Sequence, residues 1–488
     1  MKNYILSLIL FLFCITTFSS CNDDSLFSNN AKTVNGVTTV SGIRAGGLER
    51  ALFIRLTFVT HLVINDTIDS RDFKTMRDEM PNLSVLDLSN ATIAAYNGYE
   101  GSGGTMVYRY AANAIPEYAF YNPLTSTANN TLVDLKLPNS IKTIKDFAFN
   151  RCNGLKGTLV IPSSVKDTIG KSAFGFCENL TGLTLSPAKL IGESAFQGCV
   201  NLTGDISILD STVQIKPWAF ANCEIINSFS ISSTVNTIGT SCFNDCGALF
   251  NVNSASVSYS SVDGVLFNKD QSTLVQFPKS KTGSYTIPST VGTIGNYSFA
   301  NCTGLTSVII PSNTSTIEDY AFSGCSGLSG AFLISSGITS IGTSVFDDCV
   351  NISSFNIAPT NTSYGFSDGV LTDLTFFTVK RCITSKSGAY ILAPEITSIE
   401  NSAFSNCSNL TSITLPESLF NIGQRAFYNC SGLTSFIVKM TNIKDFSCSA
   451  SSFEGINFEN CTLQVPVGKI ANYQTAIGWK EFYNIVEN

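Results

Sequence analysis

Charged side chains are scarce in this 488-residue chain, and basic ones do not predominate. Asp, Glu, Lys and Arg together make up 13% of the residues, and the net charge is −7 at neutral pH. The chain therefore offers no basic field for phosphates, which argues against a nucleic-acid partner. Hydrophobic residues account for 44% of the chain and include 35 Phe, so there is ample apolar material for an ordered core.

Histidine is nearly absent, because His61 is the only one in the chain. A Ser-His-Asp or Cys-His mechanism would have to use that imidazole, and no Gly-x-Ser-x-Gly nucleophile motif accompanies it. No phosphate-binding, dinucleotide-binding or calcium-loop motif occurs either. We therefore expect a protein that is not an enzyme, with no catalytic residue and no cofactor. A glycosidase pair among the 36 Asp and Glu stays open, but the sequence singles out no pair.

Long apolar runs are missing beyond the first twenty residues, so no membrane span is expected there. Residues 4–18 form an apolar run that follows Lys2 and leads to Ser19-Ser20-Cys21, as in a signal peptide. Two small residues directly before a cysteine resemble the lipobox of bacterial lipoproteins, which implies cleavage after residue 20 and lipidation of Cys21. The alternative is ordinary secretion with cleavage near Cys21 and no lipid.

Three polar residues, Asn22, Asp23 and Asp24, follow this cysteine. They resemble the acidic stretch that accompanies transfer of Bacteroidetes lipoproteins to the outer face of the outer membrane. We therefore expect a lipid-anchored protein of the outer membrane that faces the exterior.

One sequence unit recurs along most of the chain, and its constant frame is Phe-x-x-Cys. Clear copies are KDFAFNRCNGL at residues 145–155 and EDYAFSGCSGL at residues 318–328. Most copies are 22 to 25 residues apart, which falls in the range of leucine-rich repeats. Two gaps are twice as long and resemble each other: SYSSVDGVLFNKD at residue 258 matches SYGFSDGVLTDLT at residue 363. A block of several repeats was therefore duplicated.

Each cysteine is followed by Leu-x-x-apolar-x-apolar, as in Leu305, Val308 and Ile310, and often by a proline. This alternation predicts a short strand that ends in a turn. One coil cannot bury its apolar face, so the coils are expected to stack and to join their strands into a parallel sheet. The predicted fold is a leucine-rich-repeat solenoid, α/β or mainly β, with short parallel strands on one face. Turns and 3₁₀ or short extended segments are expected on the other face.

The unit I-x-x-x-A-F-x-x-C-x-x-L resembles the BspA-like leucine-rich-repeat family of bacterial surface proteins, from about Pro116 to the C-terminus. The stretch DFKTMRDEMPNLSVLDLSN resembles the amino-terminal region of such proteins in Bacteroidetes, and LQVPVGKIANYQTAIGWKEFYNIVEN resembles their terminal segment. The implied parts are a signal peptide (1–20), a linker and N-terminal capping region (21–115), the solenoid (116–460) and a C-terminal cap (461–488). In that cap, Tyr473, Trp479, Phe482 and Ile485 would cover the last coil.

The residues of the Phe-x-x-Cys frame are expected in the interior of the coils. Free cysteine behaves there as a small buried hydrophobe, and side chains stacked in register run parallel, so disulfides are not expected. Only Cys242 and Cys246 approach the spacing of zinc ligands, and we expect no metal site. The expected core residues are Phe149, Cys152, Phe174, Cys177, Phe196, Cys199, Phe220, Cys223, Phe243, Cys246, Phe299, Cys302, Phe322, Cys325, Phe346, Cys349, Phe404, Cys407, Phe427 and Cys430.

Outward positions of the predicted strands are uncharged and mostly small. The sheet of a solenoid is its usual binding surface, so these positions are candidate contacts, although they also simply suit a sheet. The candidates are Val160, Thr184, Ser207, Ser230, Asn253, Ile309, Leu333, Asn356, Thr414 and Ile437.

Two classes of function remain at this stage. The resemblance implies a cell-surface binding or adhesion module for host proteins, glycans or other cells. The alternative is a glycan-handling accessory lipoprotein or enzyme, which would show paired carboxylates in a cleft or a surface row of aromatic residues. A structural surface component is a third option. The expected partners are a protein or glycan ligand, and the membrane through the lipid anchor.

Overall fold

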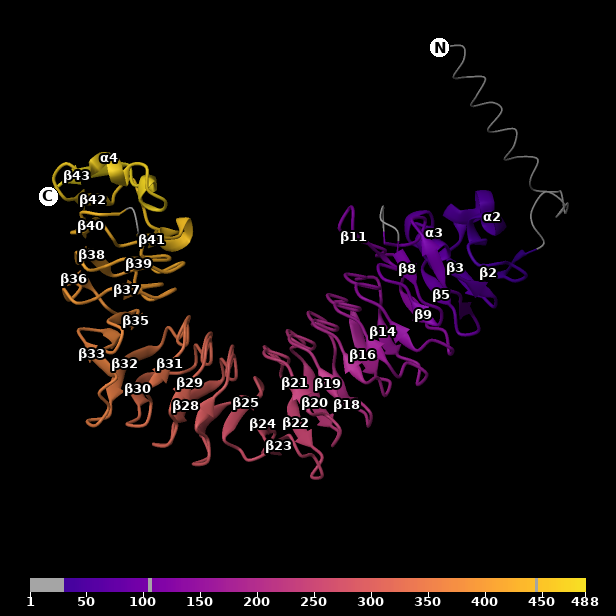
Figure 1. Cartoon of the computed structure of the whole chain (residues 1–488), viewed down its shortest axis with the longest axis horizontal. Helices are drawn as coiled ribbons and strands as arrows, with labels where there is room; N and C mark the ends of the chain where they lie inside the picture. The colour runs from indigo at the N-terminus through magenta and orange to yellow at the C-terminus, as the bar shows by residue number, and fades with distance from the viewer. Residues whose placement is uncertain (1–29, 104–107, 444–445) are drawn as a thin grey trace, which may run out of the picture. The chain divides into compact units, whose positions relative to one another are not determined.

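The computed structural model describes residues 30–103, 108–443 and 446–488 (Figure 1). The expected signal peptide and Cys21 lie outside the described residues. The chain divides into two compact units, Met1–Leu180 (unit 1) and Thr181–Asn488 (unit 2). Within the described ranges, no helix is long and apolar enough to cross a membrane.

Unit 1 is a stack of coils that begins with a hairpin. Parallel pairing joins the long strands after the antiparallel pair β1–β2. The sheet contains β1 (Ala31–Val34), β2 (Val37–Val40), β3 (His61–Ile64), β5 (Val85–Asp87) and β12 (Asp134–Lys136). The segment expected as a cap and the first part of the repeat region therefore share one sheet. The next long strand is β14 (Gly157–Val160).

A second row of two-residue parallel strands runs along the other side of the unit 1 coils. It consists of the pair β4 (Thr67–Ile68) and β6 (Thr92–Ile93), then of β9 (Ala114–Ile115), β13 (Thr143–Ile144) and β15 (Thr168–Ile169). The remaining elements are α2 (Leu48–Leu52), η2 (Phe53–Phe58), α3 (Ser70–Asp78), and the hairpins β7 (Tyr96–Gly98) with β8 (Tyr108–Tyr110) and β10 (Tyr121–Asn122) with β11 (Thr127–Ala128).

Helix α3 begins at a capping box. The Asp69 carboxylate accepts the Arg71 backbone N–H at 2.9 Å, and the Asp72 carboxylate accepts the Asp69 N–H at 2.8 Å. Both contacts satisfy N–H groups that the first helical turn leaves without partners. Asp72 is buried and also accepts the N–H groups of Gly46 and Leu48, at 2.7 and 2.9 Å, so one carboxylate joins α3 to the start of α2.

Unit 2 repeats the same plan. Apart from the first one, at the boundary, its long strands pair in parallel within four sheets. They are β16 (Leu180–Thr184) at the boundary, then β18 (Gly204–Ile208), β20 (Ile226–Ile231), β22 (Leu249–Val252), β26 (Gly283–Thr286), β28 (Leu305–Ile309), β30 (Gly330–Ile334), β32 (Ile352–Ile357), β36 (Gly388–Ile391), β38 (Leu410–Leu415), β40 (Ser435–Val438), β42 (Thr462–Val465) and β43 (Asn484–Glu487). The short strands are β17 (Leu190–Ile191), β19 (Gln214–Ile215), β21 (Thr237–Ile238), β27 (Thr293–Ile294), β29 (Thr316–Ile317), β31 (Ser340–Ile341), β37 (Ser398–Ile399), β39 (Asn421–Ile422) and β41 (Ser447–Cys448).

The two double-length gaps of the repeat fold into antiparallel insertions. The first insertion comprises β23 (Tyr259–Val262), β24 (Val265–Asn268) and β25 (Thr273–Gln276), and the second β33 (Tyr364–Ser367), β34 (Val370–Asp373) and β35 (Thr378–Cys382). In each, the third strand pairs in parallel with the next short strand. Each insertion therefore starts a new row of short strands, and we call the two places the first break and the second break.

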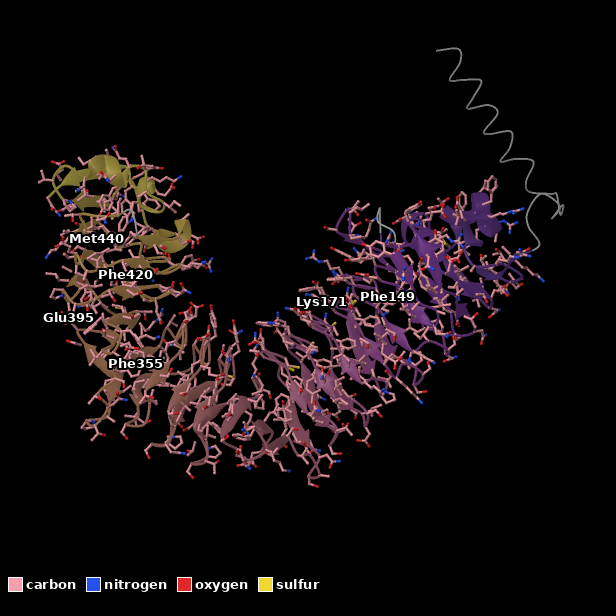
Figure 2. All side chains as sticks on the ribbon, viewed as in Figure 1. Phe149, Lys171, Phe355, Glu395, Phe420 and Met440 are labelled. Atoms are coloured by element: carbon pink, nitrogen blue, oxygen red, sulfur yellow. The ribbon has the colours of Figure 1, made fainter. Side chains whose placement is uncertain are left out.

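Phenylalanine rings stack through the interior of the coils. In unit 1 the rings of Phe149 and Phe174 lie 5.1 Å apart at 5°, and in unit 2 those of Phe299 and Phe322 lie 4.8 Å apart at 20°. Every residue of the expected core set is buried, with no more than 4% of any exposed. Figure 2 labels Phe149 in this interior and Lys171 and Glu395 among the exposed side chains.

The buried thiols do more than fill space. The Cys325 thiol donates to the Phe299 carbonyl of the preceding coil at 2.9 Å, and the Cys430 thiol donates to the Phe404 carbonyl at 3.0 Å. The thiols of Cys177, Cys223 and Cys349 bond the preceding coil in the same way. The sequence analysis treated these cysteines only as small hydrophobes and missed a coil-to-coil hydrogen bond.

An aromatic cluster covers the end of unit 2. Tyr473, in α4 (Ile470–Tyr473), and Trp479, which begins η4 (Trp479–Glu481), are fully buried, and Phe482 is 3% exposed. The Trp479 ring lies 4.8 Å from that of Phe453, in η3 (Ala450–Phe453), and the Tyr473 hydroxyl donates to the Met440 carbonyl at 2.8 Å. Ile485 pairs with Leu463 in the terminal strand β43 and is partly buried.

The predicted leucine-rich-repeat solenoid is confirmed as the fold class. The long strands occupy one side of each coil, and turns with two-residue strands occupy the other. The short extended pieces expected on that side are these two-residue strands.

Candidate binding surfaces

The exposed side chains of the long strands form one surface on each unit, which we call the strand face. In unit 2 the pairing register aligns them, since Ser207 lies opposite Ser230 and Leu333 lies opposite Asn356. Eight of the ten predicted contact residues are exposed: Val160, Thr184, Ser207, Ser230, Asn253, Ile309, Leu333 and Asn356.

The position of Asn253 needs a correction. Ser230 lies opposite Asn251, so Asn251 is the member of this row, and Asn253 follows the end of β22. The cause is the interior fit: Phe250, 3% exposed, lies opposite Phe229 and fills the core site, while Leu249 is 44% exposed. Counting from Leu249 as the usual core leucine therefore shifted the prediction by two residues.

Thr414 is also wrong as an outward contact, because it is only 9% exposed. It lies between Ile391 and Ile437 on the neighbouring strands, and these two larger side chains cover its short one. Ile391 is 68% exposed and is the residue that this coil presents to solvent. Ile437 itself is only partly exposed.

Hydrogen bonds between small polar side chains run along the strand face of unit 2. The Ser228 hydroxyl donates to Asp205 at 2.6 Å, and the Ser307 hydroxyl donates to that of Ser284 at 2.8 Å. Further along, the Asn484 amide donates to Thr462 at 2.8 Å. The face is nearly uncharged, and Ile309 (55% exposed) and Leu333 (45%) are its exposed apolar contacts.

The strand face of unit 1 carries charge instead. Asp87 lies opposite Lys136, and their side chains form an ion pair at 2.9 Å. His61, at the start of β3, lies opposite Val85 and is partly exposed. Within the described part of the chain, no group of three or more His, Cys, Asp or Glu is placed to hold a metal ion.

Aromatic side chains form a surface row on the turn side of unit 2, which the sequence analysis missed. The Tyr297 and Tyr320 rings stack at 4.7 Å and 10°, and the Trp218 ring meets Tyr297 edge-on at 5.4 Å. All three are partly exposed, and we call them the aromatic row. The available signal was the residue two places before each repeat Phe, as in KPWAF, GNYSF and EDYAF.

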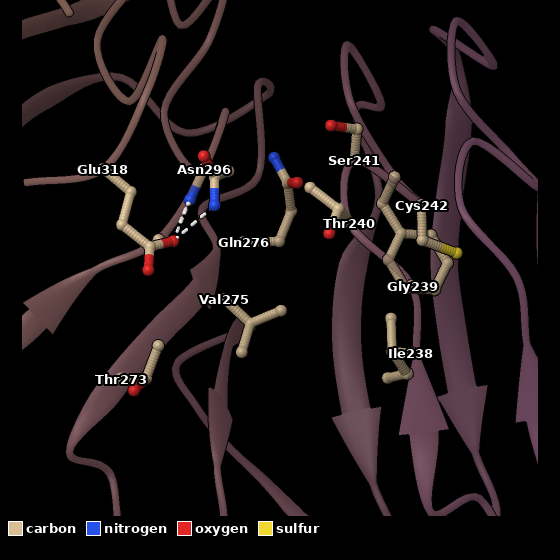
Figure 3. A pocket seen from close by; sticks show the side chains of 12 residues that line it. Ile238, Gly239, Thr240, Ser241, Cys242, Thr273, Val275, Gln276, Asn296 and Glu318 are labelled. Carbon is tan, nitrogen blue, oxygen red and sulfur yellow. Dashed lines mark hydrogen bonds between the residues drawn. The ribbon is translucent and has the colours of Figure 1, made fainter. Parts of the chain in front are cut away.

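A pocket of about 150 Å³ lies at the first break, where β21 ends one row of short strands and β25 begins the next (Figure 3). Thr240 and Ser241 stand on one side, and Gln276 and Asn296 on the other. The Glu318 carboxylate accepts both the backbone N–H of Asn296, at 2.9 Å, and its side-chain amide, at 2.5 Å.

The second break holds a cluster of buried charges. Lys380 donates to the Ile341 carbonyl at 2.7 Å and pairs with Glu400, and Arg381 donates to the Ser402 carbonyl at 2.6 Å. Burial raises the pKa of Glu400 to about 7 and outweighs the opposing effect of Lys380. Burial likewise raises the pKa of Asp347 to about 6, against the field of Arg381.

A family model of known proteins agrees with this architecture. The family model described as BspA type leucine rich repeat region (6 copies) matches residues 113–249, 189–283, 272–389 and 380–476. Since these matches span most of the chain, the protein belongs to this family of leucine-rich-repeat proteins. The comparison with curated proteins found no significant match.

Three of the similar solved structures are bacterial leucine-rich-repeat proteins. One from Eubacterium ventriosum is 25% identical, with a TM-score of 0.44, covering 64% of this chain and 85% of its own. A leucine rich cell surface protein from Faecalibacterium prausnitzii is 18% identical, with a TM-score of 0.42, covering 92% and 97%. One from Bacteroides ovatus is 16% identical, with a TM-score of 0.40, covering 88% and 90%.

Proposed function

We propose that this protein is a lipid-anchored binding module of the outer cell surface, and that it attaches to a protein partner through the strand face of unit 2. The partner belongs to a host or to another cell. The protein catalyses no reaction of its own. The lipid on Cys21 holds it at the outer membrane.

The observation that carries the proposal is the make-up of the strand face. Its small polar side chains are bonded to one another, so docking a partner costs little loss of side-chain freedom. Ile309 and Leu333 are exposed aliphatic residues of the kind that become buried at the centre of a protein interface. Few charges have to be desolvated when a nearly uncharged surface of this kind is covered.

Membership of a leucine-rich-repeat family favours binding over catalysis, because stacked coils present extended surfaces. The charged groups that stand out at the second break bond one another and backbone carbonyls. They therefore have a structural use within the solenoid.

The test is a binding screen of the full chain against an array of extracellular matrix proteins, followed by variants. The double variant Ile309→Asp/Leu333→Asp should weaken capture of any bound partner at least about tenfold, since each change places a charge in an apolar contact. The matched control is Phe420→Asp, because Phe420 is 56% exposed but lies outside the long strands. Binding that the double variant leaves unchanged would place the partner on another surface and refute the assignment to this face.

The anchor is tested separately. Cys21→Ala should move the protein from the membrane fraction to the soluble fraction, and the matched control is a serine-to-alanine change at Ser28. A variant that stays with the membrane would exclude lipidation of Cys21. Protease treatment of whole cells then reports whether the solenoid faces the exterior.

A further inference from the structure

The first and second breaks are built on the same plan. At the first break the Tyr259 hydroxyl accepts the backbone N–H of Ile238 at 2.8 Å, and at the second the Tyr364 hydroxyl accepts that of Ile341 at 2.7 Å. Each tyrosine opens an antiparallel insertion, and each isoleucine ends a short strand. The two breaks therefore share the tyrosine contact that joins each insertion to the preceding row of short strands.

A lysine crosses each break, but at a different place. Lys279 pairs with Asp245 and Glu224 across the first break, away from the residues that line the pocket. Lys380 reaches across the second break to the Ile341 carbonyl. With the offset of 105 between the two insertions, Val275 and Gln276 stand where Lys380 and Arg381 stand. The Val275 side chain has no polar group with which to bridge the gap, and the Gln276 amide donates to the Phe277 and Ser298 carbonyls of its own side. The pocket results from this difference.

One polar group in the pocket lacks a partner. Ser241 lines the pocket and is 5% exposed, and its Oγ is buried without a hydrogen-bond partner among the described residues. Leaving a buried hydroxyl unbonded costs about 1–3 kcal/mol, so the site favours a ligand that can bond it. Thr240, Gln276 and Asn296 add polar side chains around the same space (Figure 3).

The aromatic row adjoins the pocket. The backbone N–H of Trp218 donates to the Thr240 carbonyl at 3.4 Å, and Tyr297 directly follows Asn296. Thr240 and Asn296 line opposite sides of the pocket, so the contact between the Trp218 and Tyr297 rings spans its rim. Trp218, Tyr297 and Tyr320 all have positive φ, between 56° and 61°. Gly or Asn suits such a backbone best, so the backbone does not account for large rings at these positions.

We infer that the first break is a carbohydrate-binding site, in which one sugar residue enters the pocket and the rest of the oligosaccharide lies along Trp218, Tyr297 and Tyr320. The inference rests on the proposed binding role but concerns a different surface. A volume of about 150 Å³ is below the roughly 300–1,000 Å³ of pockets that enclose whole ligands, so it suits a single ring.

The chemistry of the site selects a neutral polyhydroxylated ligand. The electron-rich faces of aromatic rings attract the C–H groups of a pyranose, and amide, hydroxyl and carboxylate groups bond its hydroxyls. Glu318 at the pocket and Asp319 beside it disfavour phosphorylated or sulfated ligands. Binding should therefore change little when the salt concentration is raised.

The experiment uses the full chain in a detergent without a sugar head group, titrated with cellohexaose, maltohexaose, mannohexaose and chitohexaose. The chain has two tryptophans, and Trp479 is fully buried in the C-terminal cluster, so Trp218 fluorescence reports on the site. At least one oligosaccharide should bind at concentrations up to the millimolar range and change the emission, and Trp218→Phe should remove that change.

Two variants locate the site. Val275→Lys/Gln276→Arg introduces the two residues that stand at these positions in the second break, where Lys380 crosses the gap. Tyr320→Ala removes the far end of the aromatic row. Each should weaken binding at least about tenfold by calorimetry, since the site loses polar contacts or stacking area. Phe376→Ala is the matched control, an exposed ring (71%) at the second break, and it should leave affinity unchanged. Melting curves of each variant serve as the control that it is folded.

The results that would overturn this inference differ from those that would overturn the proposed function. Failure of all four oligosaccharides to bind, or binding that survives both pocket variants, overturns the inference while leaving the strand face intact as a protein-binding surface. Loss of a protein partner in Val275→Lys/Gln276→Arg but not in Ile309→Asp/Leu333→Asp would also overturn it, since the pocket would then take a peptide.

Discussion

Trp479 gives a sharp test of the aromatic cluster that closes unit 2. Its ring is fully buried against Phe453, Tyr473 and Phe482, at centroid distances of 4.8, 5.5 and 6.2 Å. Removing a buried Trp or Phe ring costs about 3–5 kcal/mol. The indole Nε1 has no hydrogen-bond partner among the described residues, which already destabilises the folded state by about 1–3 kcal/mol.

The cost of removing the ring and the cost of the unbonded N–H together predict different losses of stability for two substitutions of Trp479. Trp479→Ala removes the ring together with its unbonded N–H, so the net loss should lie near the lower limit, about 3 kcal/mol. Trp479→Phe keeps most of the apolar contact and removes the N–H, so the loss should stay below about 1 kcal/mol. Because coils contact only their neighbours, the damage should be local to the end of unit 2.

The assay is hydrogen exchange of the two variants and the wild type, compared strand by strand. Trp479→Ala should lower protection in β40 and β42, while protection in β3 and β5 of unit 1 serves as the internal control. Equal losses in both variants would mean that the indole N–H is bonded in the folded protein. Unchanged protection in Trp479→Ala would show that residues 461–488 are a tail rather than a cap.

Three further outcomes follow from the buried thiols and charges. Cys325→Ala should lower the free energy of unfolding by about 1–2 kcal/mol, because it removes a hydrogen bond to the preceding coil as well as buried volume. Cys302→Ala should lower it less, because the Cys302 thiol bonds the Ala300 carbonyl of its own coil. Equal losses would mean that the hydrogen bond to the preceding coil does not stabilise the fold. Burial raises the pKa of Cys302 to about 12, so its thiol should resist alkylation in the folded chain and react after denaturation, and rapid native labelling would contradict its burial. The raised pKa of Glu400 means that the folded chain holds a proton that the unfolded chain releases near pH 4.5, so this stabilising contribution is complete below pH 4.5 and is lost as the pH rises through about 7. Denaturant unfolding should show a loss of up to about 3 kcal/mol in the free energy of unfolding over this pH range, and Glu400→Gln should reduce that loss. An unchanged pH dependence in this variant would mean that another group causes it.

The repeat frame predicted the interior of the solenoid from sequence. A period near 23 residues places Phe149, Cys152 and their equivalents at one site of every coil, and all are buried. The final aromatic residues also break that frame, which is why a closing segment could be predicted from Leu463 onward. These features depend on residues that lie close together in the sequence or recur at a fixed interval.

Contacts between coils were decided only by the tertiary structure. Phe250 occupies the core in place of Leu249 because it lies opposite Phe229, and Thr414 is buried because Ile391 and Ile437 flank it. The pocket at the first break lies where the Val275 side chain does not reach across a gap that Lys380 crosses in the second copy. The sequence pattern tells which side chains point inward, but side chains from residues 20 to 40 positions apart determine which of them meet and what space they leave.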